Sequence, residues 1–341
     1  MSAPKPLAVV TGGAGFIGSH MVDLLVEEGF RVHIIDNLVG GRLLNIEHHQ
    51  KNGAAVVFEK KDIRTLSPDD ALFRGAKYVF HFAGIGDIVP SIDRPTDYMA
   101  TNVLGTVHVL EAARSAKVSK VVYAASSSCY GLAEDLPTPE TAPIQPQYPY
   151  ALSKYQGEQA VFHWGDIYRL PVNSIRIFNA YGTRSRTSGA YGAVFGVFLA
   201  QKLAGKPLTV VGDGTQTRDF LYVTDVARAF YEAACTDRAQ RVYNVGAGNP
   251  QAVNHLADLL GGPRLHLPKR PGEPDCTWAD ITRIRAELGW SPRVSFEDGV
   301  RTMLENIDYW REAPVWDPAS IAEATKTWFA FLGRGKEGAA S

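Results

Sequence analysis

The chain has 341 residues, 45% hydrophobic and 21% charged, which is enough to bury one large core or two moderate ones. Its 35 Lys and Arg residues balance 36 Asp and Glu residues, so no basic excess recruits nucleic acid or an anionic membrane. Three cysteines without C-x-x-C spacing predict neither a disulfide framework nor a zinc site. With no signal-peptide core and no long apolar run, we expect a cytoplasmic protein.

A glycine-rich turn follows the first apolar segment, residues 7–10, which has the composition of a buried parallel strand. Residues 11–18 match both G-x-G-x-x-G and G-x-x-G-x-x-G through Gly12, Gly13, Gly15 and Gly18. A helical pattern runs from Phe16 to Glu28, so strand, glycine turn and helix occur in the order that a dinucleotide site requires. A tight turn without a ligand is the alternative.

The second expected strand, residues 32–35, ends at Asp36, 18 residues after Gly18. A carboxylate here can accept both hydroxyls of an adenosine ribose and would repel a 2′-phosphate, which favours NAD over NADP. Asp36 could instead only cap a turn. The nearby pair His48 and His49 lies in a polar stretch without further ligands, so we expect a solvated loop and no metal site.

Five further apolar segments predict strands at 55–58, 78–83, 121–124, 172–178 and 242–245, with helical patterns between most of them. This alternation indicates an α/β fold with a doubly wound parallel Rossmann sheet covered on both faces. We expect an NAD-binding domain at 1–180 with a return segment at about 219–260. A smaller mixed α/β substrate-binding domain would comprise residues 181–218 and 261–341.

Polar and small residues follow several of these strands, where a cofactor cleft forms in such folds. Phe82 and Ala83 begin a small-residue turn, and the hydroxyls of residues 126–128 could bind a sugar or an oxyanion, or close a turn on themselves. His81 suits a satisfied core position better than a catalytic one. Asn102 begins an apolar helical run, so it either caps a helix or contacts the cofactor.

Tyr150 and Lys154 are four residues apart, so on a helix they share one face. An ammonium one turn from a phenol favours the phenolate, so the spacing predicts a lowered tyrosine pKa and a general base. Most pairs with this spacing are ordinary surface neighbours.

The aromatic residues after Asn306 predict one or two amphipathic helices that pack on the core or help to choose the substrate. Residues 183–192, rich in Gly, Ser, Thr and Arg, predict a mobile loop.

Taken together, these motifs resemble the extended short-chain dehydrogenase/reductase family, specifically its NAD-dependent nucleotide-sugar epimerases and dehydratases, over about residues 5 to 310. The resemblance rests on the glycine turn, Asp36, Asp62-Ile63, the run 126–131 and Tyr150/Lys154, and it continues through the segments 176–182, 212–220 and 270–273.

The resemblance implies three catalytic residues, Ser126, Tyr150 and Lys154. It implies that NAD is bound by Gly12, Gly15, Phe16, Ile17, Gly18, Asp36, Asn37, Asp62, Ile63, Phe82, Ala83, Asn102, Tyr150, Lys154 and Phe178. It implies that the substrate is bound by Ser126, Ser127, Tyr150, Asn179, Arg218, Arg270, Glu273 and Thr277. Within this set, Asn179 and the two arginines would hold a diphosphate, Glu273 the nucleoside ribose, and the small Thr277 would leave room for a bulky sugar substituent.

The expected activity is C4 epimerisation of a UDP-hexose, possibly N-acetylated or a uronate, through a transient 4-keto sugar. Family dehydratases and decarboxylases carry carboxylates just after the catalytic hydroxyl, whereas this chain has Ser127 and Ser128. A dehydratase, decarboxylase or reductase of the same fold, or a non-catalytic NAD sensor, are the alternatives. By analogy with the family we expect a homodimer, and no nucleic-acid or membrane partner.

Overall fold

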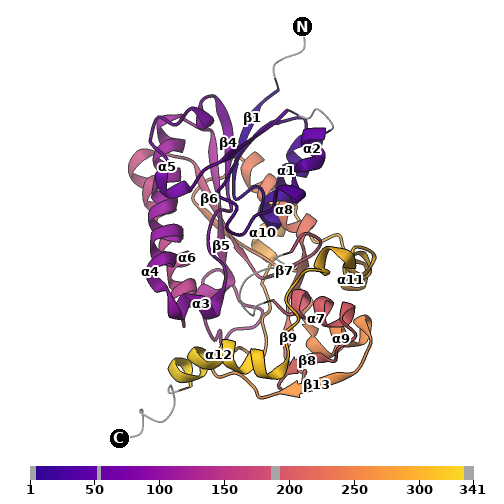
Figure 1. The fold of residues 1–341 in the computed structure, drawn as a ribbon. Coiled ribbons are helices and arrows are strands. Elements are labelled where there is room, and N and C mark those ends of the chain that lie inside the picture. The colour runs from indigo at the N-terminus through magenta and orange to yellow at the C-terminus, as the bar shows by residue number, and fades with distance from the viewer. Residues whose placement is uncertain (1–4, 52–54, 186–192, 334–341) are drawn as a thin grey trace, which may run out of the picture.

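The computed structural model describes residues 5–51, 55–185 and 193–333, which form a larger and a smaller lobe (Figure 1). The larger lobe is built on a seven-stranded parallel sheet of order β11-β6-β5-β4-β1-β2-β3. All seven predicted strands are therefore confirmed. The strands are β1 (Leu7–Thr11), β2 (Arg31–Asp36), β3 (Val56–Lys60), β4 (Ala76–His81), β5 (Lys120–Ser126), β6 (Val172–Ile177) and β11 (Arg241–Val245).

Helices cover both faces of this sheet, as its nearly continuous apolar strands require. On one face, α1 (Phe16–Glu27) packs against α8 (Val223–Cys235). On the other face, α5 (Gly105–Ser115) packs against α6 (Pro149–Tyr168), in agreement with Figure 1. The strand order reverses between β1 and β4, which opens a crevice at the carboxyl ends of these strands.

The remaining elements of the larger lobe are short. They are α2 (Glu47–Lys51), α3 (Ile88–Asp93), α4 (Pro95–Tyr98), a π-helical segment (Met99–Leu104) that runs into α5, α10 (Thr282–Leu288), and the 3₁₀ turns η1 (Leu43–Asn45), η2 (Ile63–Thr65), η3 (Ala71–Phe73) and η5 (Ser127–Tyr130).

The smaller lobe has a separate apolar core around the stacked rings of Tyr181, Phe195, Phe220 and Phe296. Its elements are β7 (Asn179–Tyr181), β8 (Leu208–Val211), β9 (Thr217–Arg218), β10 (Phe220–Tyr222), β12 (Gln251–Ala252), β13 (Arg264–Leu267), α7 (Val194–Leu203), α9 (Val253–Leu260), α11 (Phe296–Glu305) and η6 (Ile307–Trp310). The C-terminal helix α12 (Pro318–Leu332) packs against α3 of the larger lobe.

The packing of α9 and α10 crosses the domain boundaries expected from the sequence. Val253, Leu256 and Leu260 of α9 lie in the smaller lobe's core, although the return segment was expected to continue to about residue 260. Conversely, Ile284 of α10 lies in the larger core and this helix packs on β11. Strand pairing and apolar contacts between segments distant in the sequence therefore decide which lobe each helix belongs to.

Most of the loop 183–192 lies outside the described residues. His48 and His49 do not lie in a solvated loop as expected, because they belong to α2 and His49 is buried against α1. In the part of the chain that the structure describes, no helix combines the length and the apolarity needed to cross a membrane.

Candidate functional site

A cavity of about 610 Å³ lies between the two lobes, at the carboxyl ends of β5 and β6. Both lobes contribute walls, with α3 and α6 from the larger lobe and α7 and β9 from the smaller. Eleven residues predicted to be functional line it: Phe16, Ile17, Ser126, Ser127, Tyr150, Phe178, Asn179, Arg218, Arg270, Glu273 and Thr277. Residues more than 140 positions apart in the sequence therefore share one cavity.

The glycine turn packs tightly against the turn after β4. Gly12 has a φ of +71°, and a Cβ on it would lie 2.7 Å from the backbone nitrogen of Ala83. A Cβ on Gly18 would lie 2.1 Å from the Gly12 carbonyl oxygen. A residue with a side chain is therefore excluded at Gly12 and at Gly18. Because no side chain covers the turn at these positions, an anionic ligand can approach the backbone amides at the start of α1.

Asp36 is held beside this turn. Its carboxylate accepts hydrogen bonds from the backbone N–H groups of Ala14 (3.1 Å) and Leu38 (2.8 Å). Burial raises the pKa of this carboxyl, and the two hydrogen bonds oppose that effect. The structure therefore brings the predicted ribose acceptor to the predicted dinucleotide turn.

Asp62 has more partners than the sequence suggested. Arg64 pairs with its carboxylate through two hydrogen bonds of 3.0 and 2.7 Å, and Asn37 donates a third of 3.0 Å. The hydrogen bonds from Arg64 hold the pKa of this carboxyl well below its usual range. Ile63 is buried where a Cβ on Gly105 of α5 would collide with it.

Asn102 does not cap a helix. It lies inside the continuous helical run that starts at Pro95, and its side chain is buried. Its amide oxygen accepts from the Ile85 N–H (2.8 Å), and its NH₂ group donates to the Ile85 carbonyl (3.0 Å) and to Ser153 Oγ (2.9 Å). Asn102 thus fastens the loop after β4 to the tyrosine helix α6.

Tyr150 and Lys154 lie on adjacent turns at the start of α6, as predicted. The Lys154 ammonium lies 4.4 Å from the centre of the Tyr123 ring, and burial lowers the pKa of this lysine to about 7. Burial raises the pKa of Tyr150, and a hydrogen bond with Ser126 opposes that shift. The lowered tyrosine pKa predicted from the spacing is therefore wrong for this structure, because burial is the largest influence on Tyr150 and it raises the pKa.

Ser126 ends β5 and caps the turn η5. Its hydroxyl oxygen accepts hydrogen bonds from the Ser128 N–H (3.2 Å) and the Ser128 hydroxyl (2.8 Å). The serine run therefore closes on itself, yet Ser126 also reaches Tyr150. With Ser128 donating to its oxygen, the Ser126 hydroxyl proton stays available for another acceptor.

Another part of the cavity wall is positively charged. Arg218 and Arg270 flank Glu273, with nitrogen–oxygen distances of 3.9 and 3.5 Å. Burial and the neighbouring Arg270 charge lower the pKa of Arg218. Two guanidinium groups around one carboxylate leave net positive charge, which suits a diphosphate.

Thr277 orients Asn179, which lines the same cavity as this charged group. The Thr277 hydroxyl donates to the Asn179 amide oxygen (2.6 Å) and accepts from the Asp219 N–H (3.1 Å). With its oxygen engaged, Asn179 offers its NH₂ group as a donor to an anion. Thr277 lines the cavity as expected, but its hydrogen bonds with Asn179 and Asp219 were not predicted from the sequence.

The cavity is also lined by residues that were not predicted as site residues, among them Asp87, Tyr148 and Trp328. Asp87 raises the pKa of Tyr150 through its negative charge. The Tyr148 ring is parallel to that of Tyr150 and lies 5.9 Å from Trp328, whose Nε1–H donates to the Pro271 carbonyl (2.8 Å). The sequence offered two signals for these residues: Tyr148 lies two residues before Tyr150, and Trp328 belongs to the aromatic stretch expected to pack on the core or help to choose the substrate. The position of α12 at the cavity is set by tertiary packing.

This chain is similar to known proteins over most of its length. The model of the NAD dependent epimerase/dehydratase family matches residues 8–246. UDP-glucose 4-epimerase of Mycolicibacterium smegmatis is 36% identical over 307 residues, which cover 87% of this chain and 97% of that protein.

Two solved structures are similar over nearly their whole length. UDP-glucose 4-epimerase of Thermotoga maritima, solved with UDP-glucose, has a TM-score of 0.81 at 32% identity over 90% of this chain and 99% of the other. UDP-glucuronic acid 4-epimerase of Bacillus cereus, solved with UDP-glucuronic acid and NAD, has a TM-score of 0.81 at 30% identity over 89% and 99%. The chain is therefore a member of the NAD-dependent epimerase/dehydratase family of extended short-chain dehydrogenases/reductases.

Proposed function

We propose that this protein is an NAD-dependent nucleotide-sugar epimerase that inverts C4 of a UDP-hexose through a transient 4-keto sugar. One observation carries the proposal: a single cavity is lined both by Tyr150 and Ser126 and by the Arg218–Glu273–Arg270 group. The similarity to UDP-sugar 4-epimerases supports the same activity. The glycine turn, which cannot accept a Cβ, and Asp36 would hold NAD.

In this proposal Tyr150 accepts the proton of the sugar's C4 hydroxyl, and Ser126 donates a hydrogen bond to the oxygen as it becomes a ketone. When bound, NAD would supply reversible acceptance of a hydride and a positive charge. Lys154 would hold the nicotinamide ribose. The cavity's volume of about 610 Å³ gives the keto sugar room to turn before the second transfer.

The positively charged group of Arg218, Glu273 and Arg270 would anchor the part of the substrate that does not react. Arg218, Arg270 and the Asn179 NH₂ group would bind the diphosphate, and Glu273 would accept from the nucleoside ribose. An anchor at the diphosphate lets the sugar rotate while the nucleotide stays bound. Thr277 has a small side chain, which leaves space for an N-acetyl group or a carboxylate.

Asp87 favours a second candidate, a dehydratase of the same fold. Elimination of water needs a carboxylate near the sugar, and Asp87 lines the cavity close to Tyr150. Its charge is on the loop before α3, whereas the positions next to Ser126 hold hydroxyls. The hydroxyls make epimerisation the better supported activity.

The deciding experiment is incubation with UDP-, dTDP-, CDP- and GDP-hexoses, N-acetylhexosamines and hexuronates without added cofactor. We expect one UDP-sugar and its C4 epimer to interconvert, as seen by NMR, with no change of mass. A product lighter by water or carbon dioxide would establish a lyase, and a requirement for stoichiometric NADH would establish a reductase. If the protein contains bound NAD but converts none of these sugars, the alternative of a non-catalytic NAD sensor would be supported.

We further propose a homodimer formed through the α5 and α6 faces. Leu104, Leu152 and Ile167 are exposed apolar residues on or beside these helices. Light scattering after size-exclusion chromatography tests this assembly, and a monomer at micromolar concentration would contradict it. Three free cysteines fit the cytoplasmic location that we also propose, which fractionation of cells would test.

A further inference from the structure

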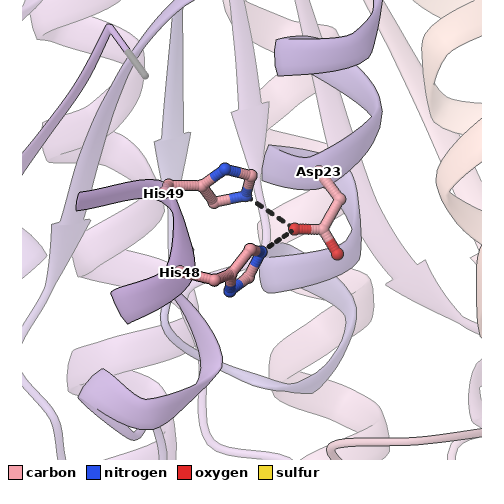
Figure 2. Close-up of side chains that lie close together, drawn as sticks. All are labelled: Asp23, His48 and His49. Carbon is pink, nitrogen blue, oxygen red and sulfur yellow. Dashed lines mark hydrogen bonds and ion pairs between the residues drawn. The ribbon is translucent and has the colours of Figure 1, made fainter. Parts of the chain in front are cut away.

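A second group of chemically active side chains lies outside the cavity, between α1 and α2 (Figure 2). Asp23 projects from α1, and both imidazoles of the neighbouring residues His48 and His49 point at its carboxylate. His48 Nε2 lies 2.9 Å and His49 Nε2 lies 2.6 Å from the same oxygen, Asp23 Oδ1. None of the three residues is needed for the proposed epimerase chemistry.

We propose that Asp23, His48 and His49 form a binding site for a divalent transition metal, Zn²⁺ first. One ligand atom from each residue lies within 4.8 Å of the other two. Two imidazoles and one carboxylate suit Zn²⁺ or Co²⁺, whereas Mg²⁺ and Ca²⁺ prefer sets of oxygen atoms. Three protein ligands leave a fourth position for water, and His48, whose side chain is 41% exposed, leaves it open to solvent.

The distances allow this coordination with a small adjustment. Ligand atoms around tetrahedral zinc lie roughly 3.3–3.6 Å apart, since each bond is about 2.0–2.2 Å long. The imidazole nitrogens need to move away from Asp23 Oδ1 by about 1 Å or less. Rotation of two ring planes on a short helix provides such a movement without a change of fold.

Groups around the cluster orient its carboxylate. The Arg184 guanidinium donates to Asp23 Oδ2 (2.7 Å), which leaves Oδ1 for the metal. His20 donates from Nε2 to the Thr183 carbonyl (3.0 Å), because a carbonyl can only accept. These two contacts connect the site to the segment that follows β7 and enters the cavity at Ser185. The metal would thus be structural, fixing α2 and this segment to α1.

The test uses the untagged full-length chain after treatment with a chelator. Titration with Co²⁺ should give the intense visible bands of a tetrahedral site that saturate at one equivalent, and Zn²⁺ should displace them. Zn²⁺ should also raise the midpoint of thermal unfolding. The variant H48A/H49A should lose the bands, with Co²⁺ affinity at least tenfold weaker.

The matched control is H255A/H266A, which removes two histidines of the smaller lobe and should bind Co²⁺ like the unmodified chain. If the double variant of the cluster fails to fold, H48A alone serves, since the His48 side chain is 41% exposed, whereas His49 is buried. Equal Co²⁺ binding by the cluster variant and the control would overturn the proposal. Absence of tetrahedral bands at one equivalent would also overturn it and leave a His–Asp–His hydrogen-bonded bridge. Neither result bears on epimerase activity.

Discussion

The Tyr150 phenol is subject to opposing influences at the scale of single residues. Burial raises its pKa, the Asp87 charge adds to this, and the hydrogen bond with Ser126 works in the opposite direction. Lys154, one turn along α6, has a pKa lowered to about 7 by its own burial. In the chain alone these surroundings favour the protonated phenol, so the proton-acceptor role proposed for Tyr150 depends on the positive charge that bound NAD would supply. Removal of the Tyr150 hydroxyl tests this role directly.

Replacement of Tyr150 by phenylalanine should lower kcat by about 10²–10⁴-fold, because the substrate's C4 hydroxyl loses its proton acceptor. The substrate KM should change little, since the diphosphate anchor is untouched. NAD released from the denatured protein should stay at the unmodified protein's level. The measurement is the interconversion rate by NMR with the UDP-sugar that the panel experiment identifies.

Tyr168→Phe provides the control for this variant. Tyr168 lies on the same helix, but at its far end, where the ring is 47% exposed and packs under Arg114. The Tyr168→Phe protein should therefore interconvert the sugars at the rate of the unmodified protein. A Tyr150→Phe protein that is equally fast would remove Tyr150 from the mechanism.

At the scale of elements, α6 is fastened to the sheet by a buried ion pair. Arg176 of β6 donates to the Glu158 carboxylate through Nη2 (2.5 Å) and Nε, and Ser174 donates a hydrogen bond of 2.7 Å. Glu158 lies eight residues after Tyr150, on the same face of the helix. The pair therefore sets the depth at which Tyr150 enters the cavity.

Glu158→Gln should lower the free energy of unfolding by about 3–5 kcal/mol, because the Arg176 guanidinium would remain buried without a countercharge. Urea unfolding at pH 7.5 measures the loss. The double variant Glu158→Leu/Arg176→Met should recover much of it, since neither charge of this pair is then left buried.

The exposed pair Arg94–Asp97 is the control for this prediction. Its side chains are 68% and 50% exposed and lie 3.9 Å apart, so Asp97→Asn should change the stability by less than about 1 kcal/mol. Equal losses for Glu158→Gln and Asp97→Asn would mean that the buried pair does not anchor α6.

For the molecule as a whole, buried histidines link stability to pH. His81 is 1% exposed between the hydroxyls of Thr11 (2.7 Å) and Thr106 (2.9 Å), so it is the satisfied core residue that the sequence suggested. Burial lowers its pKa to about 3, and burial lowers the pKa of His20 to about 4. Both stay neutral in the folded chain at pH values where the unfolded chain is protonated.

Stability should therefore fall as the pH is lowered from about 6.5 towards 3, because unfolding takes up protons in this range. His81→Gln removes one such group. Between pH 7.5 and 5.5 the unmodified protein should lose about 1.3 kcal/mol more than this variant, given an unfolded histidine pKa of about 6.5. Urea unfolding at both pH values measures the difference. An identical loss in the two proteins would show that His81 is protonated in the folded state.

The sequence alone determined the sheet and the kind of site. Seven apolar segments with turn residues between them specify parallel strands, because such strands are buried on both faces and need no alternation of polar residues. The sequence also predicted that the glycine turn and Asp36 lie close together, since the carboxyl ends of adjacent parallel strands meet at one edge of the sheet. The spacing of Tyr150 and Lys154 was enough to place both on one face of a helix.

Only the tertiary structure decided the environment of those residues. The sequence carries the spacing of Tyr150 and Lys154 but not their burial, and burial reverses the expected direction of the tyrosine pKa. Asn102 fastens a loop to α6, and His48 and His49 meet Asp23, because long-range packing sets their partners. Local patterns fix secondary structure, whereas solvent exclusion and contacts between distant segments set the chemistry of each side chain.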